Sequence, residues 1–145
     1  MVRRFCLCRL NNMNVQEYYN NALAQRGYKP DEAQQRAITR LQQCYDEWVE
    51  YKGQRSSTFK RLINRPAVPK GVYMWGGVGR GKSFLMDSFF SVVPLVRKTR
   101  LHFHEFMREV HRELAELHGT VNPLQELAKR MARRYRLICF DEFHV

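Results

Sequence analysis

The sequence predicts an α/β fold with a parallel sheet, preceded by a helical N-terminal segment, from three observations. Short apolar runs alternate with helical patterns over residues 71–145, and this alternation requires crossover connections between parallel strands. A glycine-rich turn joins the first of these runs to the first of these helices. Residues 13–52 show helical patterns alone. A chain of 145 residues has the length of one domain, and its 44% hydrophobic residues can form a core.

Composition narrows the classes of protein. No apolar run approaches the ~18 residues of a membrane span, and no long apolar segment follows the N-terminal arginines as in a secretory signal. The 4 cysteines lack zinc-site and disulfide-scaffold spacings, so we expect reduced thiols in a cytosol-like compartment. The net charge of +11 is spread along the chain, which favours a solvated basic surface over a polyanion-binding patch.

The N-terminal half divides into three segments. Residues 1–12 have no periodicity and are expected to form an unstructured extension. Two helices are predicted in residues 13–52, over 15–26 with Gly27 as its left-handed stop and over 30–51 with an acidic first turn. The second carries one apolar stripe: Ala33, Ala37, Ile38, Leu41, Tyr45, Trp48 and Val49. Residues 53–70 combine glycine, serines, prolines and scattered cations, which indicates a basic linker loop.

Residues 71–145 form the predicted α/β part. Strands are expected at 71–75, 99–104 and 137–141. Helices are expected at 82–91, 105–118 and 123–135. The aromatic Trp75 and the stripe Phe106, Val110, Leu114 and Leu117 are interpreted as core residues.

The glycine-rich turn predicts a phosphate-binding site. It lies between a predicted strand and a predicted helix and matches the pattern G-x-x-x-x-G-K-[ST]. The fixed positions are Gly76, Gly81, Lys82 and Ser83, and the variable positions between them are Gly77, Val78, Gly79 and Arg80. Glycines let consecutive backbone N–H groups converge on phosphate oxygens, and the following helix adds its positive dipole end. Lys82 can reach the β- and γ-phosphates of a nucleotide, and the Ser83 hydroxyl can ligate Mg²⁺. ATP and Mg²⁺ are therefore the expected cofactors.

A second cluster follows the apolar run LICF, where Asp141 and Glu142 end the last predicted strand. Ligands of open α/β sheets lie at the carboxyl ends of the strands. Asp141 is expected to hold Mg²⁺ through water, and Glu142 to activate the water that attacks the γ-phosphate. An activating glutamate favours ATP hydrolysis over kinase chemistry, which must keep water away from the γ-phosphate.

These residues resemble a known family. The stretches KGVYMWGGVGRGKSFLMDSFF, RLHFHEFMREVH and LICFDEFHV are similar to the ZapE-like AAA+ ATPases, bacterial cell-division proteins with mitochondrial relatives. The resemblance implies a P-loop NTPase of AAA+ type, with a three-layer αβα domain and ATP hydrolysis as its activity. It also implies assembly into a homo-oligomer and action on the bacterial division ring with an FtsZ-like partner in the cytoplasm. In a eukaryote, the resemblance instead implies a role in mitochondrial protein quality control.

The chain ends at Val145, shortly after Glu142, whereas that family continues through further strands, an arginine finger and a helical lid. We therefore expect a truncated domain with weak or no turnover alone. Two alternatives stay open. A nucleic-acid-associated ATPase of helicase-loader type is favoured by the charge, although no nucleic-acid motif supports it, and salt-sensitive DNA binding would identify it. A nucleotide-binding interaction module without turnover is the other. His102 and His104 match no metal-ligand spacing and are interpreted as packing residues.

Overall fold

The structure is a computed structural model that describes residues 13–27, 29, 31–57, 59, 66–77 and 81–143. It consists of two compact units, Met1–Pro94 and Leu95–Val145. The predicted extension at residues 1–12 and the middle of the predicted linker, residues 60–65, lie outside the described residues. No helix in the described part of the chain is both long enough and apolar enough to cross a membrane.

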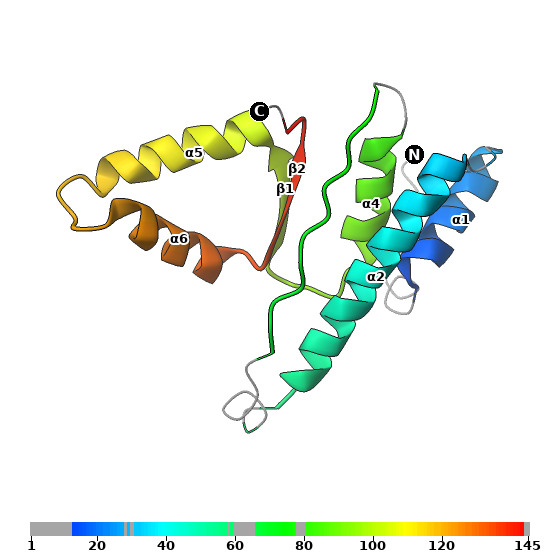
Figure 1. Cartoon of the computed structure of the whole chain (residues 1–145), viewed down its shortest axis with the longest axis horizontal. Coiled ribbons are helices and arrows are strands. Elements are labelled where there is room, and N and C mark those ends of the chain that lie inside the picture. The colour runs from blue at the N-terminus through cyan, green and yellow to red at the C-terminus, as the bar shows by residue number, and fades with distance from the viewer. Residues whose placement is uncertain are drawn as a thin grey trace, which may run out of the picture. The chain divides into compact units, whose positions relative to one another are not determined.

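In its described residues, the first unit contains three helices, α1 (Val15–Arg26), α2 (Glu32–Gln54) and α4 (Lys82–Val92), which pack together (Figure 1). A capping box begins α1: the Asn14 side chain accepts a hydrogen bond from the Glu17 backbone N–H, and the Glu17 carboxylate accepts one from that of Asn14. Gly27 ends the helix in the left-handed conformation. The predicted bounds of α1 and its glycine stop are confirmed.

The core of this unit comes from all three helices. Buried side chains include Val15, Tyr19 and Leu23 of α1, Ile38, Leu41 and Trp48 of α2, and Leu85 and Phe89 of α4. The apolar stripe predicted for α2 is thus confirmed in its centre, whereas Val49 is 44% exposed and does not belong to the core. The helix also runs past its predicted end, since the Gln54 amide bonds the Glu50 carboxylate one turn back.

Residues 66–77 are described without secondary structure, so the strand predicted at 71–75 is not present. A strand requires a hydrogen-bonded neighbour, and among the described residues the only strand ladder lies in the second unit. Trp75, which we predicted to be a core residue, is 85% exposed for the same reason. The segment contacts α2 through the Cys44 thiol, which lies 3.7 Å from the Lys70 carbonyl oxygen.

The second unit contains β1 (Lys98–His102), α5 (Phe103–Glu116), α6 (Pro123–Arg134) and β2 (Leu137–Asp141). The two strands pair in parallel, with His102 opposite Asp141, and the two helices form the crossover between them (Figure 1). This arrangement confirms the predicted α/β class and parallel sheet. The bounds predicted for β2 are also confirmed.

The boundary between β1 and α5 differs from the prediction. We expected the strand to continue to residue 104, but α5 already begins at Phe103, which places His104 on the helix. The Glu105 carboxylate accepts a hydrogen bond from the His102 backbone N–H at 3.3 Å. This helix-capping contact outweighs the alternating pattern of the preceding residues.

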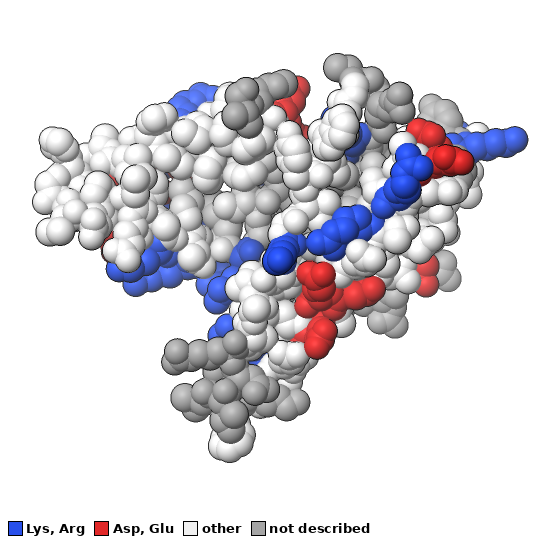
Figure 2. All heavy atoms as spheres, in the orientation of Figure 1, with Lys and Arg blue, Asp and Glu red and all other residues white. Residues whose placement is uncertain are grey.

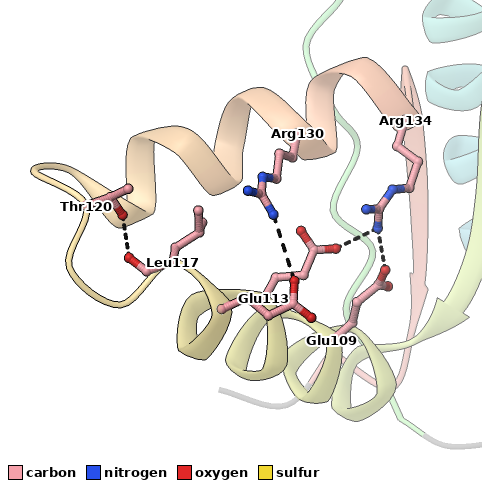
Figure 3. Close-up of polar contacts among 7 residues, drawn as sticks. Glu109, Glu113, Leu117, Thr120, Arg130 and Arg134 are labelled. Carbon is pink, nitrogen blue, oxygen red and sulfur yellow. Dashed lines mark hydrogen bonds and ion pairs between the residues drawn. The ribbon is translucent and has the colours of Figure 1, made fainter.

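The helices α5 and α6 pack as a hairpin with its own small core. Leu117, Leu127 and Met131 are buried there, and Phe106, Val110 and Leu114 pack against them, which confirms the predicted stripe. Arg134 Nη1 lies 2.6 Å from Glu109 Oε1 and 2.7 Å from Glu113 Oε1 (Figure 3). The Glu113 side chain is 4% exposed, so Arg134 compensates a carboxylate held in the core.

Charged side chains on the visible face of the first unit lie in separate groups. Figure 2 shows a line of basic side chains over α2 beside a group of acidic ones. Two arginines of this helix pair with its own glutamates: Arg36 lies 3.6 Å from Glu32, and Arg40 lies 3.7 Å from Glu47. Exposed ion pairs of this kind are typical of a solvated surface and contribute little to stability.

We predict that Arg134→Ala lowers the free energy of unfolding by about 2 kcal/mol, because it leaves the buried Glu113 carboxylate without its counter-charge. The control is Arg130→Ala, whose partner Glu116 is 3.9 Å away and 59% exposed. We expect that change to cost less than about 1 kcal/mol. Urea unfolding followed by circular dichroism measures both, and equal losses would contradict the buried-pair interpretation.

Candidate functional site

The two ends of the predicted phosphate loop lie in the first unit. Gly76 and Gly81 adopt positive φ angles of 147° and 72°. Val78, Gly79 and Arg80, three of the predicted nucleotide contacts, lie outside the described residues. The loop therefore enters and leaves through backbone conformations that favour glycine.

Lys82 is the first residue of α4 and points back over the loop. Its Nζ donates hydrogen bonds to the carbonyl oxygens of Gly76 and Gly77, both at 2.8 Å. Ser83 follows in the first turn and is exposed. The first turn of a helix presents unpaired backbone N–H groups and a positive dipole end, so this arrangement gathers donors and positive charge suited to an anion.

The second predicted cluster lies at the carboxyl end of β2. Arg100 of β1 donates through Nε at 2.9 Å and Nη2 at 2.7 Å to the same Asp141 oxygen, Oδ2. Glu142 follows with a φ of 53°, a left-handed conformation that is uncommon for a residue with a side chain. The Glu142 carboxylate is 66% exposed and lies 3.8 Å from His102 Nδ1. Both carboxylates thus face a basic residue of β1.

Sequence reasoning missed Arg100 and gave His102 no functional role. The parallel pairing of β1 with β2 brings both side chains to the carboxylates, and only the register of the sheet reveals this. His102 and His104 still stack, with ring centroids 5.6 Å apart, although they belong to different elements. No group of three or more His, Cys, Asp or Glu side chains in the described part of the chain could hold a metal ion.

The cysteines described by the structure are Cys44 and Cys139, and both are buried free thiols. Burial raises the pKa of the Cys44 thiol, which keeps it protonated. Both thiols thus pack as small apolar side chains.

Comparison with known proteins identifies the family. The sequence model of the family described as AFG1-like ATPase matches residues 13–145. The chain belongs to the AFG1-like ATPase family. This membership, with the similarity to the cell division protein ZapE described next, confirms the resemblance that the sequence predicted.

Three curated relatives illustrate the breadth of the AFG1-like family. The cell division protein ZapE of Escherichia coli K12 is 40% identical over 138 residues, which cover 88% of this chain and 37% of that protein. An uncharacterized protein of Schizosaccharomyces pombe is 36% identical over 66% of the chain and 22% of its own length. Lactation elevated protein 1 homolog B of Danio rerio is 40% identical over 93 residues, which cover 57% of this chain and 18% of that protein. The chain thus spans less than two-fifths of each relative. No solved structure matches it significantly.

We predict that Gly81→Ala lowers the free energy of unfolding by about 1–2 kcal/mol, since alanine disfavours a left-handed φ. Its methyl group would also lie 3.0 Å from Gln34 Nε2. Gly77→Ala is the matched control within the same loop, because no described atom lies within 4 Å of a Cβ there. Thermal and urea unfolding without nucleotide measure both variants. Equal stability of the two would contradict the role of the Gly81 turn.

Proposed function

We propose that this AFG1-like ATPase binds Mg·ATP at the phosphate loop of residues 76–83 and hydrolyses it. The observation that carries the proposal is the position of Lys82, at the first turn of α4 directly after a glycine with positive φ. Family membership supports the same chemistry. Gly76, Gly77, Val78, Gly79, Arg80 and Gly81 would supply backbone donors to the phosphates.

Binding would exchange contacts that Lys82 already makes. Its ammonium group donates to two carbonyl oxygens of the loop, so it lies beside the backbone that would surround the β- and γ-phosphates. Phosphate oxygens carry more negative charge than carbonyl oxygens and would attract the ammonium group more strongly. Ser83 would ligate Mg²⁺ through its hydroxyl group, as in other P-loop NTPases.

Hydrolysis would use the two carboxylates after β2. Asp141 would hold Mg²⁺ through water, and Glu142 would accept a proton from the attacking water molecule. The Arg100 contact holds the Asp141 carboxylate at the carboxyl end of β2, from which it would reach Mg²⁺. The left-handed backbone of Glu142 supports a functional role, since strained conformations of this kind cluster at active sites.

The proposed activity implies a domain architecture, an oligomeric state and a protein partner. We infer an AAA+ type αβα domain to which these residues contribute one part, and assembly into a homo-oligomer. The name of the Escherichia coli relative, cell division protein ZapE, supports a role in division. We propose an FtsZ-like protein of the division ring as the partner, which would place this protein in the cytoplasm.

We predict that Lys82→Ala abolishes ATP binding, because it removes the only described loop side chain that can neutralise phosphate charge. Ser83→Ala should instead weaken binding mainly when Mg²⁺ is present. Titration of a fluorescent ATP analogue, with and without Mg²⁺, measures both variants against the unmodified chain. Unchanged affinity of the Lys82 variant would overturn the assignment of the loop as the nucleotide site.

We further predict that Glu142→Gln, in the full-length protein, still binds Mg·ATP but hydrolyses it ~10²-fold more slowly, because the amide keeps the shape and loses the basicity. Asp141→Asn should reduce both the rate and its dependence on Mg²⁺. Phosphate release measures the rates, and light scattering shows whether ATP holds the Glu142 variant in a larger assembly. Hydrolysis at the unmodified rate would remove Glu142 from the mechanism and favour a binding module.

A further inference from the structure

The side chain of Gln34, from the first turns of α2, lies against the last glycine of the phosphate loop. A Cβ built on Gly81 would lie 3.0 Å from Gln34 Nε2 and 3.8 Å from Gln34 Cδ. A side chain at position 81 would therefore come so close to the Gln34 amide that the amide would have to shift by a few tenths of an ångström. The contact links a helix of the N-terminal segment to the turn at which α4 begins.

Tyr19 of α1 fixes the orientation of this amide. Its hydroxyl group donates a 2.8 Å hydrogen bond to Gln34 Oε1, which directs the NH₂ end of the amide toward Gly81. Tyr19 is 1% exposed, so its hydroxyl group has little access to water. Burial, followed by the nearby charge of Asp31, raises the pKa of Tyr19, and the phenol therefore stays protonated and able to donate.

A second contact joins the same tyrosine to α4. The ring centroids of Tyr19 and Phe84 lie 5.6 Å apart, and the Arg26 guanidinium carbon lies 4.9 Å from the Phe84 centroid. Phe84 directly follows Ser83 in the sequence. The start of α4 therefore has two neighbours in the N-terminal helices, the Gln34 amide beside Gly81 and the Tyr19 ring beside Phe84. Tyr19 contacts both Gln34 and Phe84.

We propose that Gln34 is a positioning residue for the phosphate loop and that Tyr19 orients it. The proposal rests on the proposed nucleotide site at this loop. Donors aimed at phosphate oxygens act best when they are fixed before the ligand arrives, because no binding energy is then lost in ordering them. Gln34 acts from outside the P-loop sequence pattern. The N-terminal helices, on this account, set the affinity for nucleotide in addition to forming a core.

The test uses three variants of the chain: Gln34→Ala, Tyr19→Phe and the double variant. Tyr19→Phe keeps the ring that packs on Phe84 and removes only the hydroxyl group. We expect Gln34→Ala to weaken binding of a fluorescent Mg·ATP analogue about tenfold, with a smaller loss for Tyr19→Phe. The double variant should bind no more weakly than Gln34→Ala, because Tyr19 acts through Gln34.

The control is Gln35→Ala, which removes an exposed glutamine next in the same helix and should leave affinity unchanged. Affinities are measured at a temperature where circular dichroism shows every variant folded. A merely structural role for Gln34 predicts unmodified affinity there. That result, or additive losses in the double variant, would overturn the proposal. Lys82→Ala is titrated alongside: if it binds as the unmodified chain does, the proposed nucleotide site itself fails, whatever the Gln34 variants show.

Discussion

The candidate site depends on one backbone turn, the left-handed conformation of Gly81. The Gly81 carbonyl oxygen accepts the first hydrogen bond of α4, from the Leu85 N–H at 3.0 Å, so the loop ends and the helix begins at this residue. Lys82 and Ser83 consequently occupy the first turn, where the helix dipole favours an anion. Any side chain at position 81 would strain the backbone, and its Cβ would lie 3.0 Å from Gln34 Nε2. The sequence of the loop, the start of the helix and the packing of α2 are therefore parts of one constraint.

Each charged side chain to which we assign a role in ATP hydrolysis contacts another polar group of the protein. Lys82 bonds two loop carbonyl oxygens, Arg100 bonds Asp141, and His102 lies near Glu142. Each contact holds a charged side chain close to the backbone or strand end from which it would act. Arg100 differs from the others because its partner is only 18% exposed, and partial burial strengthens the attraction. Mg²⁺ would compete with Arg100 for Asp141, so this contact bears directly on metal affinity.

Local signals predicted most of the elements, and long-range contacts account for what the sequence could not reveal. The bounds of α1 follow from Asn14 and Gly27, and the start of α4 follows from Gly81, because caps act within a few residues. The prediction of a strand at 71–75 was wrong because strand pairing depends on residues that are distant in the sequence. The contact between Arg100 and Asp141 spans 41 residues, and the one between Tyr19 and Gln34 joins two helices. The functional roles of Lys82, Ser83, Asp141 and Glu142 stay predictions.

The position of Lys82 with nucleotide bound tests the central claim most directly. A crystal structure of the protein with Mg²⁺ and a non-hydrolysable ATP analogue would locate its Nζ atom. We expect that atom to leave the carbonyl oxygens of Gly76 and Gly77 and to lie ~2.8 Å from oxygens of the β- and γ-phosphates. Gly81 should keep its left-handed conformation. A structure in which the analogue binds elsewhere, with Lys82 still bonded to the two carbonyl oxygens, would contradict the account.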